Sequence, residues 1–174
     1  MGRRSRVAWS SIVAALTVAL SLAACAGSGS SADAIDYSAE SFPSGEAVST
    51  ADLRGDPLLL ASWATWCVEC EEEMPALERF WRDRRDDGLQ VVAVNLNAPG
   101  PAEDRIATMA ADWGLSMPQW RDADNDFTSA FDGVGVPMVV LLDAEGAIVG
   151  TWHGAVDFED ADFLAAVDAA VADA

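Results

Sequence analysis

The stretch that decides the fold is LLLASWATWCVEC, residues 58–70. Its first half follows Pro57 and is short and almost wholly apolar, which is typical of a strand buried on both faces. Its second half places two residues between Cys67 and Cys70, and the residues after them predict a helix that begins at or near Cys67. The unpaired N–H groups and positive end of such a helix favour the thiolate form of Cys67. The stretch therefore predicts a pair of redox-active thiols at a strand-to-helix junction.

The start of the chain predicts an export signal. Three arginines precede an apolar run over residues 7–20, which is short for a membrane span. The run closes on Leu-Ala-Ala-Cys, which resembles a bacterial lipobox and implies cleavage before Cys25 and lipidation of its sulfur. The alternative is an ordinary signal peptide with a stray cysteine. We expect a signal peptide at 1–24, the lipidated cysteine and a flexible tether at 25–33, and one domain at 34–174. That domain would be extracytoplasmic and anchored to the cell membrane as a lipoprotein.

The remaining cysteines favour exchange chemistry over a structural role. If Cys25 carries lipid, the pair at 67 and 70 is all that is left, and so short a loop constrains little of the unfolded chain. A closed zinc site needs four ligands, and the chain has a single histidine, His153, which we expect to be structural. We therefore predict no metal and no cofactor beyond the disulfide itself. The alternative is a Cu(I) site made from the two thiolates.

The net charge of the chain limits the classes of partner that it can bind. The net charge is −19 with no lysine, and loss of the three leader arginines lowers it by three to −22. So acidic a surface argues against nucleic acid and against electrostatic adhesion to anionic lipid. We interpret it as a solvated surface, and a covalent anchor is then the natural reason for residence at a membrane. We expect a monomer with no nucleic-acid partner.

The rest of the chain predicts a mixed sheet with helices on both faces. Strands are expected at 48–49, 58–63, 89–95, 117–121, 138–142 and 147–152, the last two as a hairpin. Helices are expected from the cysteines to Gly88 with a kink at Pro75, and at 102–113, 124–131 and 158–171. In the first helix, the 3.6-residue period places Glu73 and Leu77 on the inward face and Glu78 outside it.

The motifs of residues 34–174 form a set. It comprises Leu53-Arg54-Gly55, Trp63-Ala64-Thr65-Trp66-Cys67 with Cys70, Glu73-Met74-Pro75, an extra strand and helix between about 90 and 131, and Gly135-Val136-Pro137 before Leu141-Leu142-Asp143. The set resembles the thioredoxin fold and, within it, the membrane-tethered TlpA/ResA-like thiol-disulfide oxidoreductases. The resemblance implies an α/β fold with a central mixed sheet flanked by helices and the TlpA-type extra segment.

The same resemblance implies a substrate site beside the cysteines. It implies a cis peptide bond between Val136 and Pro137, with the backbone there pairing with substrate as an added strand. Trp66 would flank the site, with a place in the core as its alternative, whereas Trp63 is expected in the core. Two positions depart from the family pattern, because Glu69 stands where many members have proline and Ala61 stands where thioredoxin has an acid.

The departure at Ala61 shifts any buried-acid role to Glu73, the position at which the TlpA/ResA-like proteins carry their active-site glutamate. We predict that Glu73 has a raised pKa and passes a proton to and from Cys70. The alternative is an acid that only complements the start of the helix. Cys67 would be the nucleophile and Cys70 the resolving thiol, since the later sulfur is covered by the first helical turn.

The predicted activity is reduction of disulfides in other exported proteins. Acids crowd the cysteines, which disfavours thiolate and points to the reducing end of the family. The resemblance implies the paired cysteines of apocytochrome c as a substrate, and the tether makes a membrane electron donor plausible. The alternatives are a disulfide-forming oxidase of the same fold and a copper chaperone for an oxidase metal centre.

Overall fold

The computed structural model of the chain describes Gly2, residues 33–98 and residues 103–174. The expected signal peptide, lipidated Cys25 and nearly all of the tether lie outside the described residues, as does the expected helix start at Ala102. In the described part of the chain, no helix is both long and apolar enough to cross a membrane.

A seven-stranded mixed sheet forms the centre of the domain, with strand order β2-β1-β5-β4-β3-β6-β7. The strands are β1 Ser38–Ser41, β2 Ala47–Ser49, β3 Leu58–Trp63, β4 Gln90–Asn95, β5 Gln119–Arg121, β6 Met138–Leu142 and β7 Ile148–His153. Strands β3, β4 and β5 run parallel, whereas β6 is antiparallel to both β3 and β7. The sheet is thus mixed and ends in the late hairpin, as the sequence predicts.

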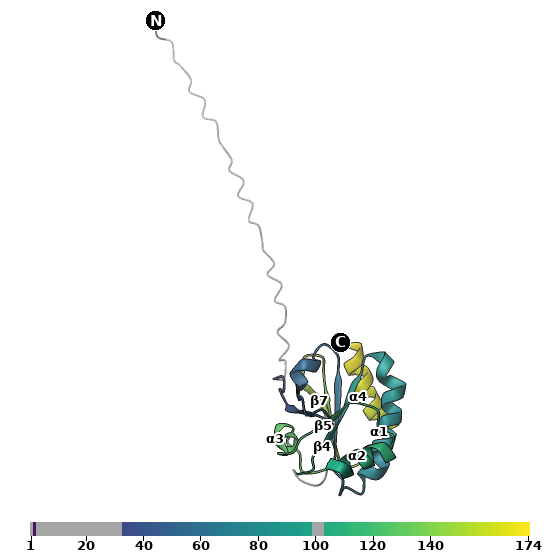
Figure 1. Cartoon of the computed structure of the whole chain (residues 1–174). Helices are drawn as coiled ribbons and strands as arrows, with labels where there is room; N and C mark the ends of the chain where they lie inside the picture. Colours follow the sequence, from purple (N-terminus) through teal and green to yellow (C-terminus); the bar gives the residue numbers. More distant parts are fainter. Residues whose placement is uncertain (1, 3–32, 99–102) are drawn as a thin grey trace.

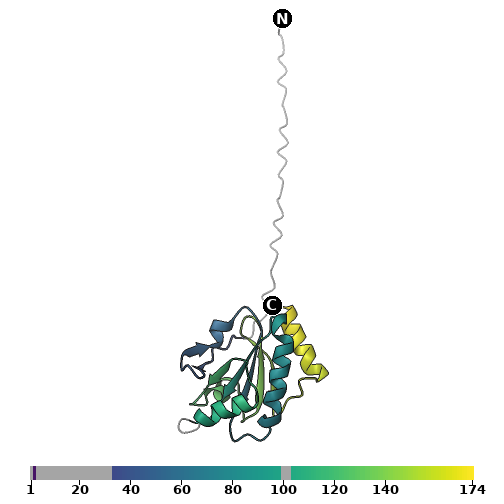
Figure 2. The same ribbon diagram turned by 45° about the vertical axis from the view of Figure 1, so that its right-hand side comes forward.

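Helices cover both faces of this sheet, as expected. They are α1 Cys70–Arg84, α2 Glu103–Asp112, α3 Asp126–Ala130 and α4 Ala161–Ala172, with short 3-10 helices at Thr50–Leu53 and Arg85–Asp87. On one face α1, α2 and α4 pack over a core that includes both cysteines, and α1 and α4 lie side by side (Figures 1 and 2). On the other face α3 and the segment around Tyr37 enclose a second, aromatic core. The central mixed sheet with flanking helices, predicted from the sequence, is therefore confirmed.

The first helix differs from its prediction at its start. It begins at Cys70 rather than at Cys67, because residues 64–67 form a turn closed by a 3.1 Å hydrogen bond from the Cys67 N–H to the Ala64 carbonyl. The helix continues through Pro75 to Arg84 and gives way to the 3-10 turn that ends at Gly88. Gly88 has φ +94°, a left-handed conformation that glycine adopts without strain.

Glu78 was predicted to face away from the core, and this is wrong. Its carboxylate is buried and accepts hydrogen bonds from the Ser116 hydroxyl and from the N–H groups of Ser116 and Met117, because the segment after α2 folds over this side of α1. Burial alone would raise the pKa of Glu78, but these hydrogen bonds and the charge of Arg82 hold that pKa below its ordinary value. Glu78 is therefore a structural carboxylate that ties α1 to the β5 side of the sheet.

Candidate active site at the end of strand β3

The two cysteines lie where β3 gives way to α1. They form a disulfide, with the Cα atoms 5.4 Å apart, and the Cys70 N–H points at the Cys67 sulfur over 3.2 Å. Residue Cys67 is 4% exposed and Cys70 is fully covered. Both residues are thus buried, and of the two only Cys67 keeps any solvent exposure.

Apolar side chains stand exposed around this disulfide. Trp66 is 65% exposed, and Val68, between the cysteines, is 75% exposed. Trp66 also borders a hollow of about 380 Å³, whose walls are Trp66, Leu96, Ala98, Asn125, Thr128, Gly133, Val134, Gly135 and Val136. Trp63, by contrast, is fully buried and makes an edge contact with Trp113 at 5.1 Å between ring centroids. Trp66 therefore lies at the surface beside the cysteines and not in the core, which was its alternative place. Trp63 belongs to the core, as expected.

The peptide bond between Val136 and Pro137 is cis, as the family resemblance implies. It directly precedes β6, whose first residue Met138 lies opposite Ser62 and accepts a 3.2 Å hydrogen bond from the Ser62 hydroxyl. The Pro137 carbonyl accepts from the Gly154 N–H at 3.0 Å, while Val136 lines the same hollow as Trp66. A second cis bond, Phe42-Pro43, was not predicted.

Glu73 is buried in the first turn of α1, as its place in the helical period predicts. It is 3% exposed, and its Oε1 accepts a 3.0 Å hydrogen bond from the Val156 N–H. Its other oxygen, Oε2, is buried with no hydrogen-bond partner in the described residues. Burial raises the pKa of Glu73 to about 7, although the Val156 hydrogen bond opposes the rise. A carboxyl group in this state can hold or release a proton near neutral pH.

The other acids near the cysteines are solvent-facing. Glu69, Glu71 and Glu72 are exposed, and Glu69 stands at the helix start without a side-chain capping hydrogen bond.

Ala61 is fully buried in the middle of β3, and the exposed His153 ends β7. Among the described residues, no group of three or more His, Cys, Asp or Glu side chains is arranged to hold a metal ion.

A polar network behind the Cys67 turn was missed at the level of sequence. It joins Thr65, Asn95, Asn97 and Arg121, all of them buried. One signal could have found part of it, because Asn95 and Asn97 come at the carboxyl end of a buried parallel strand, where functional side chains gather in open α/β sheets.

Comparison with known proteins shows which family the chain resembles. The sequence profile of the AhpC/TSA family matches residues 31–151. The thioredoxin-like protein YneN of Bacillus subtilis is 34% identical over 65% of this chain and 65% of its own length. The thiol-disulfide oxidoreductase ResA of Halalkalibacterium halodurans is 30% identical over 63% of this chain and 61% of its own length. The chain thus spans less than two thirds of the length of these relatives, and its likeness to ResA confirms the family resemblance.

Solved structures show the same fold. A Chlorobium tepidum protein superposes with a TM-score of 0.71 at 23% identity, covering 81% of this chain and 96% of its own. A thiol:disulfide interchange protein from Chlorobium tepidum gives a TM-score of 0.66 at 23% identity over 82% of this chain and 98% of its own. StoA from Bacillus subtilis gives 0.61 at 23% identity over 74% and 94%. Identities this low establish the fold alone.

Proposed function

This chain belongs to the AhpC/TSA family and has a thioredoxin-like fold, and on that basis we propose that it is a thiol-disulfide oxidoreductase acting through Cys67 and Cys70. The observation that carries the proposal is the Cys67–Cys70 disulfide at the junction of β3 and α1, in which Cys67 keeps some solvent exposure and Cys70 keeps none. In sequence Cys67 stands between the exposed Trp66 and Val68, and Trp66 borders the hollow. The names of the ResA relatives support the same activity.

In the reducing direction, the thiolate of Cys67 attacks one sulfur of a substrate disulfide, whose other sulfur leaves as a thiolate. The thiol of Cys70 then loses its proton and attacks the Cys67 sulfur. This breaks the mixed disulfide, releases the second substrate thiolate and leaves the Cys67–Cys70 disulfide. The substrate gains the two electrons that the cysteines lose. The burial of Cys70 suits a sulfur that reacts only with its neighbour.

We assign Glu73 the proton that Cys70 must lose. Glu73 lies one helical turn after Cys70 on the same face of α1, and both residues are buried. A pKa of about 7 lets the carboxyl accept this proton and later return it without a strong bias either way. Replacing Glu73 with Gln should change the titration of the thiols and the turnover, and unchanged values for both would rule out the proton role.

We propose reduction as the physiological direction. Glu69, Glu71 and Glu72 add negative charge around the cysteines, and negative charge disfavours the thiolate. A strong oxidant such as DsbA depends on a stabilised reduced form, so a less stable thiolate corresponds to a stronger reductant. A measured potential of about −120 mV, the DsbA value, would contradict this direction and favour the oxidase alternative.

The proposed setting is outside the cytoplasm, at the cell membrane. The support is the predicted leader and the Leu-Ala-Ala-Cys motif. Substrates there would be exported proteins with paired cysteines, and the family resemblance suggests apocytochrome c as one of them. A membrane protein would then return electrons to the disulfide.

Trapping of substrates tests the activity. In the full chain, Cys70→Ser removes the resolving thiol, so substrates should remain joined to Cys67 as mixed disulfides that dithiothreitol releases. Cys67→Ser is the matched control and should trap nothing. The proposal fails if Cys70→Ser traps no protein and the wild-type chain does not reduce a protein disulfide such as that of insulin.

A further inference from the structure

We propose that Asn97, held in place by Arg121, is a positioning residue that fixes the turn bearing Cys67 through two hydrogen bonds to Thr65. The inference rests on the proposed thiol-disulfide exchange and adds residues that the Cys67, Cys70 and Glu73 chemistry does not use. It concerns the reduced form of the protein most strongly.

The Asn97 side chain makes two hydrogen bonds to Thr65. Its Oδ1 accepts from the Thr65 N–H at 2.9 Å, and its Nδ2 donates to the Thr65 hydroxyl at 2.8 Å. Thr65 lies inside the turn that the Cys67 N–H closes onto the Ala64 carbonyl. With both ends of the amide engaged, the middle of this turn is attached to the end of β4 rather than to solvent.

Arg121 holds Asn97 from the other side. Its guanidinium donates to the Asn97 carbonyl at 2.8 Å, to the Asn95 side-chain oxygen at 3.2 Å and to the Ala98 carbonyl at 3.2 Å. The Asn95 oxygen also accepts from the Asn97 N–H at 3.1 Å. Arg121 is only 6% exposed, and a charge buried at this depth is costly unless its hydrogen bonds are made. The guanidinium therefore resists any movement of the Asn97 backbone.

The same segment forms one wall of the hollow. Leu96 and Ala98 line it, while Asn97 between them turns toward Thr65. Trp66, the neighbour of Thr65, lines the same hollow. The Asn97 side chain thus joins the turn that bears Trp66 and Cys67 to the Leu96–Ala98 segment, which lines the hollow beside it.

The two hydrogen bonds between Asn97 and Thr65 matter less in the oxidised protein than in the reduced protein. In the oxidised protein, the bond between Cys67 and Cys70 itself holds the turn against α1. In the reduced protein that bond is gone, so the Asn97 contacts do more of the work of keeping Cys67 near the Cys70 N–H. Loss of the contacts should therefore destabilise the reduced form more than the oxidised form, and the disulfide should become harder to reduce.

The test measures the equilibrium constant for reduction of the full chain by glutathione, in which two glutathiones yield the protein dithiol and glutathione disulfide. Thr65→Val removes the hydroxyl at nearly constant volume, and Asn97→Ser breaks both hydrogen bonds from the partner side. Each should lower the constant at least threefold, which corresponds to a potential more negative by about 14 mV. Thr65→Ser keeps the hydroxyl and should restore the wild-type constant.

Thr50→Val is the matched control. Thr50 is a buried threonine at the opposite end of the sheet, and its hydroxyl donates to the Ile35 carbonyl at 2.9 Å and accepts from the Tyr37 N–H at 3.0 Å. Its loss should lower the melting temperature of the oxidised protein without moving the glutathione constant. If Thr65→Val proves too unstable, Asn97→Ser carries the test.

Two results would overturn the inference while leaving the proposed function intact. One is a wild-type glutathione constant in both Thr65→Val and Asn97→Ser. The other is an equal shift in Thr50→Val, which would reduce the role of Asn97 to general stability. A wild-type chain that does not exchange with glutathione at all would instead overturn the proposed function and the inference with it.

Discussion

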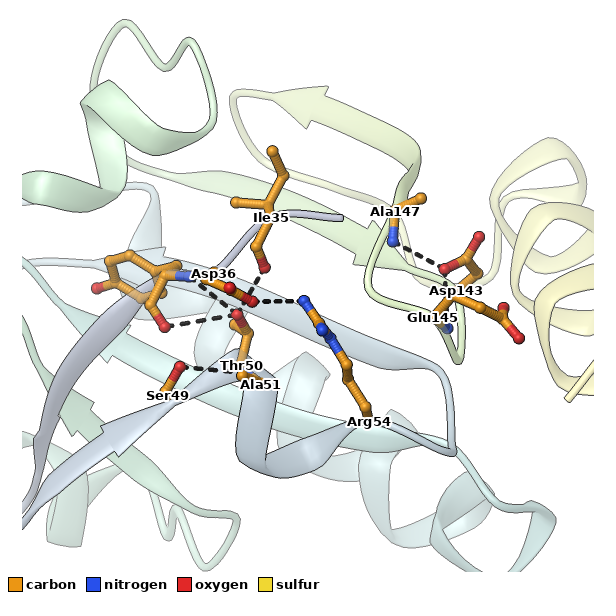
Figure 3. Close-up of polar contacts among 10 residues, drawn as sticks. Ile35, Asp36, Ser49, Thr50, Ala51, Arg54, Asp143, Glu145 and Ala147 are labelled. Atoms are coloured by element: carbon orange, nitrogen blue, oxygen red, sulfur yellow. Dashed lines mark hydrogen bonds and ion pairs between the residues drawn. The ribbon is translucent and has the colours of Figure 1, made fainter. Parts of the chain in front are cut away.

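The two ends of the central sheet differ in how fully their polar groups are paired. At the Leu58 end of β3, Thr50 links Ile35 to Tyr37, Arg54 pairs with Asp36, and the Asp143 carboxylate caps the β6–β7 turn (Figure 3). Backbone hydrogen bonds from Ile35 to Gly146 and from Gly55 to Ala144, both of 2.9 Å, close this end further. The start of the domain is thereby fastened to the far hairpin.

At the end with the disulfide, several buried polar groups lack hydrogen-bond partners among the described residues. Four buried side-chain atoms in the described residues have no hydrogen-bond partner, and three of them lie here, namely Trp63 Nε1, Glu73 Oε2 and Asn95 Nδ2. Exposed apolar side chains, Trp66 and Val68, stand at the same end. Unpaired buried groups and exposed apolar surface both oppose stability, so their coincidence beside a disulfide marks this end as the functional one. Under the proposed function, the closed end supplies stability and the open end supplies chemistry.

The largest expected effect comes from Cys67, the proposed nucleophile at the open end. Cys67→Ser should abolish disulfide reduction, leaving the uncatalysed rate, because no thiolate remains within reach of substrate. Ser49→Ala, which removes a cap at the closed end, should leave the rate unchanged. A continuous insulin-reduction assay compares the two variants. Comparable losses in both would show that the two ends do not divide the roles as we describe.

The next effect is on stability at the open end. Burial raises the pKa of Glu73 in the folded protein from 4.5 to about 7. Below pH 4.5 the carboxyl is protonated in both the folded and the unfolded chain and costs no stability. As the pH rises from 4.5 through 7, the unfolded chain ionises first, and the folded protein loses stability. Glu73→Gln should therefore be more stable than wild type at pH 8, by up to about 3 kcal/mol, and nearly equal at pH 4. Urea unfolding of the oxidised proteins at several pH values measures the difference. A difference that does not vary with pH would contradict the raised pKa.

At the closed end, Thr50→Val should cost about 1–3 kcal/mol, because the Tyr37 N–H loses its acceptor in a buried place. Urea unfolding measures this cost, and the exchange rate should not change. Thr50→Ser, which keeps the hydroxyl, is the control and should recover most of the loss. A change in exchange rate with Thr50→Val would mean that the ends are coupled.

The smallest effect is expected from Arg54→Ala. The Arg54 and Asp36 side chains are 37% and 66% exposed, and exposed ion pairs contribute little. The loss should be at most about 1 kcal/mol and should shrink further in high salt. Thermal unfolding at low and high salt tests both statements, and a larger, salt-independent loss would show that Arg54 acts through packing instead.

The open end could be predicted from sequence where its signals are local. The apolar run of β3, the two cysteines and the inward place of Glu73 all follow from neighbouring residues and from period, and each lies where it was expected. The cis bond at Pro137 came from family resemblance, since an X-Pro pair by itself does not specify its isomer.

What could not be predicted depends on contacts between distant parts of the chain. The turn before α1 is held by Asn97, which is 32 residues from Thr65, and no local pattern signals that pairing. Glu78 is buried by a segment 38 residues away. Strand β1, with the sequence Ser-Ala-Glu-Ser, has no apolar alternation and forms only because β2 and β5 lie on either side of it.

The most direct test of the account identifies which sulfur takes part in exchange. The full chain is incubated in glutathione buffers that span its reduction, quenched with acid and analysed by peptide mass spectrometry. We predict a glutathione adduct on Cys67, none on Cys70, and interconversion of the Cys67–Cys70 disulfide with the dithiol. An adduct on Cys70, or a pair of cysteines that does not respond to glutathione, would contradict the account.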